Sequence, residues 1–247
     1  MNWLAPVFPT PFMERLLHLP PNSLEHSARW LVGRRYSSDI VRNALILAGT
    51  LPVTFLLLPL VLAVAWLLPI VVAVRSATRS WTHSHSSEFP LLRLTGLSAD
   101  QIGRSYALAT IYPLRDLIAW TISLAVAMLI ASVVVVLLAA GYTRMVDMLV
   151  SLYFLICFWL LTLPGWLLLA SSLGVRLGKP ASERVTAGIV AGAATGLLVT
   201  LAAGLSIMTL VATVNVRLVA LVGTAILLVV YGASWWLLNS DWHIITI

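Results

Sequence analysis

Charged side chains are scarce in this chain of 247 residues, of which only 10% are Asp, Glu, Lys or Arg. An average soluble domain carries about 25% charged residues, so this chain has too few to coat a water-soluble globule. That scarcity excludes a soluble enzyme, a nucleic-acid-binding domain and a disordered tail. The chain is instead 60% hydrophobic, with a mean hydropathy of +0.99. This composition predicts an all-α polytopic membrane protein, because a helix satisfies its own backbone hydrogen bonds in lipid.

The sequence also lacks a second cysteine, a recognisable signal peptide and a phosphate-binding loop. Cys157 is the single cysteine, so no disulfide can form within the chain, and we expect it to be a small packing residue. Residues 1–12 lack the charged start and apolar run of a cleavable signal peptide. No G-x-x-x-x-G-K-[ST] phosphate loop is present, since residues 174–180 are one residue short and place Pro180 after Lys179. We therefore expect a protein that is not itself an enzyme.

Five apolar blocks are candidates for membrane spans: 43–74, 117–141, 148–175, 185–212 and 218–238. A span needs about 20 residues, so the first block is too long for one. Arginines flank it on both sides, and basic residues collect in the cytoplasm. We therefore predict a hairpin that turns between Pro52 and Pro59, where proline ends a helix. The alternative is one long tilted helix kinked at its prolines. The arginines are Arg15, Arg29, Arg34, Arg35 and Arg42 before the block, and Arg75, Arg79, Arg93, Arg104 and Arg115 after it.

The hairpin gives six spans with both termini in the cytoplasm and places 13 of the 15 basic residues inside. We expect a multi-pass protein of the cytoplasmic (inner) membrane. Residues 1–40 mix leucines with charged residues and predict an amphipathic helix on the inner leaflet, and 41–247 form a single transmembrane domain. The predicted spans are 41–57, 59–75, 117–141, 148–175, 185–212 and 218–238, with a cytoplasmic segment at 76–115.

The cytoplasmic segment 76–115 contains the most informative stretch. Residues 89–94 predict a short amphipathic helix, and a Thr-Gly turn follows it. Ser98 can cap a second helix that has Asp100 and Gln101 in its first turn. Such an element suits contact with a soluble partner, or it is a loop that lies on the bilayer.

The order of residues from Leu91 to Ser98 resembles the coupling segment of type-2 ABC transporter permeases, in which a Leu-Leu-x-Leu-Thr-Pro-Leu-Ser run precedes the third span. Here Gly96 stands where that family usually has proline, and Glu88 alone stands near the position of its glutamates. The resemblance implies a six-span permease that hydrolyses nothing and works with a separate ATPase subunit and a second permease copy or homologue. It assigns coupling to the partner to Glu88, Leu91, Leu92, Arg93, Leu94, Thr95, Leu97, Ser98 and Arg104.

A glycine repeat in 185–212 is the clearest packing signal. Gly188, Gly192 and Gly196 recur every four residues and so share one helix face, where another backbone can approach closely. That face serves either internal helix packing or a subunit interface. We expect no cofactor and no metal, because His83 and His85 lack the further ligands that a metal site needs.

Two functions follow. The first is the permease subunit of an ABC-type exporter for an apolar or amphipathic substrate, because the predicted spans carry no deep charge that could bind an ion. The second is a non-catalytic accessory subunit that contacts other integral-membrane subunits of a larger complex, such as a respiratory or photosynthetic one. Both readings place the chain in membrane lipid, and neither involves nucleic acid.

Overall fold

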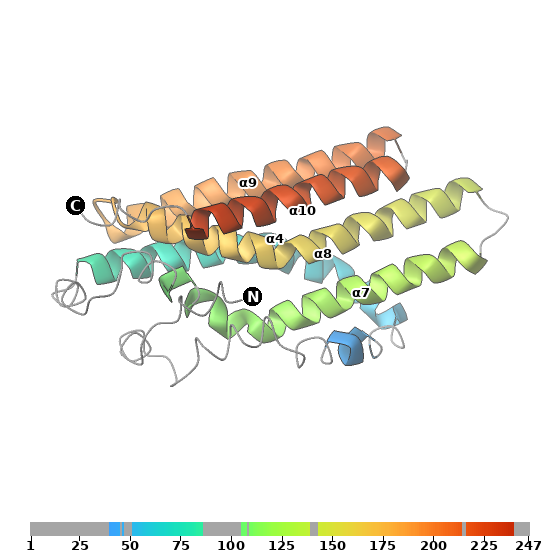
Figure 1. Cartoon of the computed structure of the whole chain (residues 1–247), viewed down its shortest axis with the longest axis horizontal. Helices are drawn as coiled ribbons and strands as arrows, with labels where there is room; N and C mark the ends of the chain where they lie inside the picture. Colours follow the sequence, from blue (N-terminus) through green and yellow to red (C-terminus); the bar gives the residue numbers. More distant parts are fainter. Residues whose placement is uncertain are drawn as a thin grey trace.

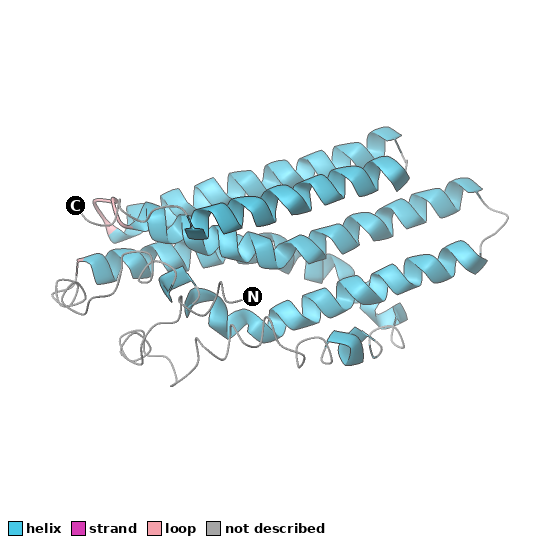
Figure 2. Ribbon diagram, in the orientation of Figure 1, coloured by secondary structure: helices cyan, strands magenta, loops and turns pink. Residues whose placement is uncertain are grey.

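The computed structural model describes residues 40–44, 46, 51–85, 105–107, 109–138, 143–213 and 216–239. Nearly all of these residues are helical, and none of them forms a strand (Figure 2). The long helices are α4 (Leu51–Ser84), α7 (Arg115–Leu138), α8 (Thr143–Gly178), α9 (Arg184–Thr213) and α10 (Val216–Asn239), and the short 3-10 turn η2 (Tyr112–Leu114) leads into α7.

Four stretches of the described chain are long and apolar enough to cross a membrane: Val61–Ser84, Val150–Gly178, Arg184–Val211 and Val216–Leu238. A fifth arises if Ser105–Ile111 and Asp116–Ile130, which meet at an angle of 68°, are counted as one bent span. The chain is therefore a helical protein with the character of a multi-pass membrane protein.

Helix α8 lies at the centre of the bundle. In Figure 1 it runs between α7 on one side and α9 and α10 on the other, and it also packs along α4. Half of the most apolar stretch of α8 is buried inside the protein, whereas only 17% of the corresponding stretch is buried in α9 and in α10. Each of the three apolar clusters takes residues from α8, which include Leu160, Leu167 and Trp166. Any displacement of α8 must therefore rearrange its neighbours, because packed interiors leave little free volume.

Polar side chains fix two of the helix pairs along α8. Ser234 of α10 donates to the carbonyl of Gly165 at 2.8 Å, and the Tyr231 hydroxyl donates to that of Leu161 at 3.0 Å. On the α7 side, the buried Cys157 thiol lies 3.4 Å from the Ala125 carbonyl. Cys157 is thus a packing residue within the α7–α8 cluster.

The predicted turn between Pro52 and Pro59 is wrong. Helix α4 runs without a break from Leu51 to Ser84 and contains Pro59 and Pro69 in its interior. Pro52 stands in the first turn, where a missing N–H costs nothing, and membrane helices tolerate internal proline because neighbouring groups satisfy the freed carbonyl. Residues 51–57 of the first predicted span and all of the second, 59–75, therefore belong to one helix.

The polar segment predicted at 76–115 begins later than expected. Helix α4 continues past residue 75, so Arg75 and Arg79 stand on its last three turns rather than in a connection. Flanking charge favours an orientation across the membrane, but it does not decide where a backbone bends. The six-span count stays a prediction, because residues 1–39 and 47–50 are outside the described part.

Candidate functional site: the basic end of the bundle

One end of the bundle collects most of the basic positions of the described helices. Helices α4, α8 and α10 end there, and α7 and α9 begin there (Figure 1). We call it the basic end, because six basic residues lie on its helix termini and on the α8–α9 connection. These are Arg75, Arg79, Arg115, Arg176, Lys179 and Arg184, whereas Arg144 and Arg217 stand at the opposite end.

The predicted coupling residues fall between two described points of this end. Residues 86–104, which hold every coupling position from Glu88 to Arg104, are outside the described part of the chain. Their two flanks are close in space, since the rings of His83 and Tyr106 have centroids 5.4 Å apart at an interplanar angle of 55°. The two described flanks that border residues 86–104 are therefore neighbours at the basic end.

The first flank, the last turns of α4, is bonded to α8 and to the connection after it. Ser80 Oγ donates to the Val175 carbonyl at 3.1 Å, and Trp81 Nε1 donates to the Ala181 carbonyl at 3.1 Å. His85 stacks on the Trp81 indole with centroids 4.3 Å apart. Since Trp81 is only four residues before the end of the described flank, these contacts place the exit of the segment against α8.

The second flank, residues 105–111, is bonded to α8 as well. Ser171 Oγ of α8 donates to the Ala107 carbonyl at 2.8 Å. Arg79 on α4 lies within electrostatic reach of Tyr106. The region between the two flanks and α8 is rich in buried hydroxyls: Ser76, Ser80, Ser105, Thr110, Ser171 and Ser172. Buried polar groups are costly in an apolar surrounding unless they are hydrogen-bonded, and here Ser76 and Thr110 bond to carbonyls of their own helices while Ser80 and Ser171 bond across helices.

Two glycines allow α4 and α8 to approach closely at this site. A Cβ at Gly174 would meet Ser76 Oγ and the Ala73 carbonyl, and one at Gly178 would meet the backbone of Ala77. From the sequence, these glycines were interpreted only as part of an incomplete phosphate loop, and their packing role was not predicted. Their i, i+4 spacing, which is the same as in the α9 repeat, was the available signal.

The α9 repeat lies against α4. A Cβ at Gly188 would stand 3.2 Å from Thr78 Cγ2, one at Gly192 would stand 2.8 Å from Val74 Cγ2, and one at Gly196 would stand 3.4 Å from Ile70 Cδ1. The residues of α4 that face the glycines are also spaced by four, so the two helices run side by side in register. Of the two interpretations left open, the contacts of this chain are those of internal packing.

His83 and His85 stand at the end of α4, within the described part of the chain. No group of three His, Cys, Asp or Glu side chains comes together there. Instead, His85 Nδ1 lies 2.9 Å from the Trp81 carbonyl and 3.1 Å from Ser84 Oγ, which are contacts within one helix end.

A small apolar crevice lies between α8, α9 and α10, lined by Leu155, Phe158, Trp159, Thr162, Ser206, Gly223 and Ile226. The Phe158 ring covers Gly223, so this crevice is shallow.

Comparison with protein-family models, curated proteins and solved structures finds nothing that matches this chain.

Proposed function

We propose that this chain is the membrane-spanning permease subunit of an ABC-type exporter. The resemblance of Leu91–Ser98 to a coupling segment motivates the proposal. The observation that carries it is the closure of the two flanks of that segment, with His83 and Tyr106 in ring contact on the basic end. A segment whose two described flanks lie side by side can receive a push from a soluble subunit and deliver it to a small area.

The contacts of the flanks suggest how such a push would reach the spans. Three hydrogen bonds join the flanks to α8 and its connection, through Ser80, Trp81 and Ser171. Since α8 packs against α4, α7, α9 and α10, a shift of the segment would tilt the central helix and repack the bundle. A separate ATPase subunit would supply the energy, because the chain holds no phosphate loop.

The proposed substrate is apolar or amphipathic. The charged residues of α7, α8, α9 and α10 stand in the first two turns or the last turn of their helices, and those of α4 stand on its last three turns. A permeating ion would need a charged partner at mid-membrane, which the described parts of these helices do not supply.

Topology belongs to the same proposal. The basic end would face the cytoplasm, with the chain in the cytoplasmic membrane and both termini inside. The amphipathic helix at residues 1–40 and a sixth crossing complete the plan, and a second permease copy or homologue would pair with this one.

Purification tests the proposal directly. The tagged chain, extracted in mild detergent from its own host, should bring down an ATPase subunit that carries a G-x-x-x-x-G-K-[ST] sequence. Arg93→Glu should lose that subunit, because it reverses a charge within the coupling segment. Arg217→Glu makes the same change at the opposite end of the bundle and should retain it. Recovery of no ATPase at any stoichiometry, or equal recovery with both variants at equal thermal stability, would contradict the proposal.

The alternative function is a non-catalytic accessory subunit of a larger membrane complex. One observation favours it: Gly204 on α9 and Gly232 on α10 are exposed, and a Cβ at either would meet nothing within 4 Å. Small outward residues let a helix of another subunit approach closely. Respiratory or photosynthetic subunits in the same purification, in place of an ATPase, would select this alternative.

A further inference from the structure

We propose that the α8–α9 connection and the last turn of α10 together bind the headgroup of an anionic phospholipid. The cations of the site are Arg176, Lys179 and Arg184, and its aromatic border is formed by Trp235 and Trp236. Its cations and indoles take no part in the proposed coupling contacts, although Trp81 bonds to Ala181 of the same connection, and the site does not depend on the transport function.

A hydrogen bond brings the two parts of the site together. Arg176, in the last turn of α8, donates from its terminal guanidinium nitrogen to the carbonyl of Leu237 at 2.8 Å. Leu237 is two residues from the end of α10, and its carbonyl is among the last ones of that helix. The contact holds the last turn of α10, with Trp235 and Trp236, beside the start of the connection that carries Lys179.

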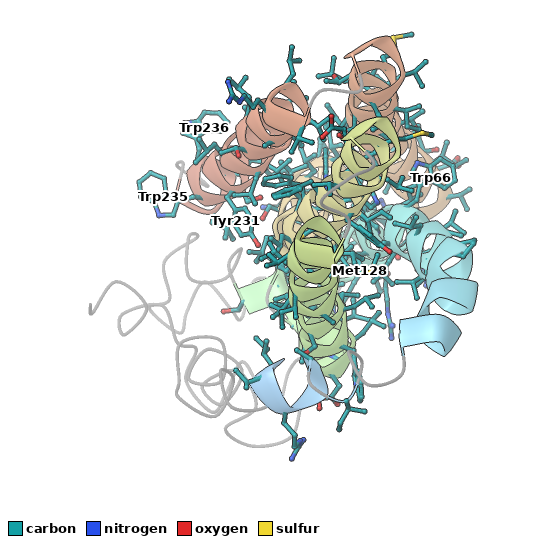
Figure 3. The ribbon with its side chains drawn as sticks, turned by 90° about the vertical axis from the view of Figure 1, so that its right-hand side faces the viewer. Trp66, Met128, Tyr231, Trp235 and Trp236 are labelled. Carbon is teal, nitrogen blue, oxygen red and sulfur yellow. The ribbon has the colours of Figure 1, made fainter. Side chains whose placement is uncertain are left out.

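The two indoles face away from the bundle. Trp235 is 61% exposed and Trp236 is 62% exposed, whereas Trp166 in the core is only 5% exposed. Figure 3 shows both rings on the outer side of α10. Tryptophan prefers the headgroup level of a bilayer, where an apolar ring meets a polar edge. The last turn of α10 therefore marks the depth at which lipid headgroups would surround the protein.

The net charge of the α8–α9 connection determines which class of lipid headgroup it would bind. Residues 176–184 hold three cations and one anion, Glu183, for a net charge of +2 within nine residues. The opposite end has Arg144 and Arg217 in the first turns of two different helices, α8 and α10, with Asp147 three residues after Arg144. A concentrated positive charge at headgroup depth attracts a phosphodiester that carries net negative charge, and it gains little from a zwitterionic headgroup. Phosphatidylglycerol is the test ligand of this class.

The test uses lipids that quench tryptophan fluorescence. The purified full chain is placed in vesicles of phosphatidylcholine that contain equal fractions of either 6,7-dibromo-phosphatidylglycerol or 6,7-dibromo-phosphatidylcholine. The fluorescence of the two indoles is the difference between the parent chain and the variant that carries both Trp235→Phe and Trp236→Phe. That difference should be quenched more strongly by the anionic lipid. Lys179→Gln with Arg184→Gln should weaken the preference for the anionic lipid by about thirtyfold, because each cation near a membrane surface contributes several-fold.

A matched pair of changes serves as the control. Arg144→Gln with Arg217→Gln removes the same charge at the opposite end and should leave the preference unchanged. Arg184 is the first residue of α9, where a cation opposes the helix dipole, so its replacement should not cost folding. Equal quenching by the two lipids in the parent chain would overturn the proposal. So would an unchanged preference in the first pair, or displacement of the anionic lipid by inorganic phosphate at constant ionic strength.

Discussion

Individual glycines determine how closely the helices of this protein approach. At Gly174 a side chain would collide with backbone of α4, which cannot move away cheaply, whereas at Gly204 it would meet nothing. The same residue type therefore has opposite meanings at the two positions. Sequence spacing alone shows that a glycine shares a face with others, but only the neighbouring helix shows whether that face is occupied.

Gly174→Ala should destabilise the protein by about 1–3 kcal/mol, the usual cost of overpacking a fitted interior. The measurement is the thermal unfolding midpoint in detergent. Gly204→Ala is the matched control, and it should be neutral or slightly stabilising because alanine is the better helix former by about 1 kcal/mol. Equal midpoints for the two variants would mean that α4 and α8 do not touch at Gly174.

Arg176 acts at the end of a neighbouring helix. Its donation to the Leu237 carbonyl ties the end of α8 to the last carbonyls of α10. Arg176→Met should therefore cost about 1.5–3 kcal/mol, as expected for a hydrogen bond to a charged group, and should speed amide exchange in residues 234–239. Arg176→Lys keeps the cation and should restore part of the protection. Exchange that is unchanged in Arg176→Met would contradict this role.

At the level of elements, helix α9 pairs with α4 along the glycine repeat of α9. Three glycines of α9 face Ile70, Val74 and Thr78 of α4. The repeat predicted a face for close approach, but it left open whether the partner is a helix of the same chain. Helix α4 takes that place because its own residues of the same spacing lie along the glycine row.

Disulfide trapping tests this pairing. In a Cys157→Ala background, Thr78→Cys with Gly188→Cys should oxidise rapidly within one chain, because Thr78 Cγ2 lies 3.2 Å from the Cβ position at Gly188. Thr78→Cys with Gly204→Cys should stay reduced. A covalent dimer formed by the first pair would instead make the glycine face a subunit interface.

At the scale of the whole molecule, the prediction concerns the side of the membrane on which each end of the bundle lies. The basic end holds the ends of α4 and α8 and the start of α9, so Ser87 and Ser182 should report the same side. In a Cys157→Ala background, Ser87→Cys and Ser182→Cys should react with a membrane-impermeant maleimide only from the cytoplasm. Asp147→Cys, near the start of α8, should react only from outside. Reaction of Ser87→Cys and Ser182→Cys from opposite sides would contradict the arrangement.

The amino-terminal side needs its own label, because α4 is a single helix and Leu51 stands at the end opposite Ser84. The six-span prediction requires Ser23→Cys to react from the cytoplasm, on the same side as Ser182→Cys. Labelling of Ser23→Cys from outside would give a topology with one crossing fewer.

Composition and hydropathy by themselves determined that this is a helical membrane protein, because scarce charge and long apolar runs leave no other way to satisfy the backbone. They also located the last four apolar blocks well, where each corresponds to one helix from α7 to α10. Only the tertiary structure decided that residues 51–84 form one helix, that α8 is central and that Gly174 and Gly178 are contact points. These features depend on which surfaces face each other. A helix with two internal prolines persists when neighbours pack along it, and a sequence read one segment at a time does not contain those neighbours.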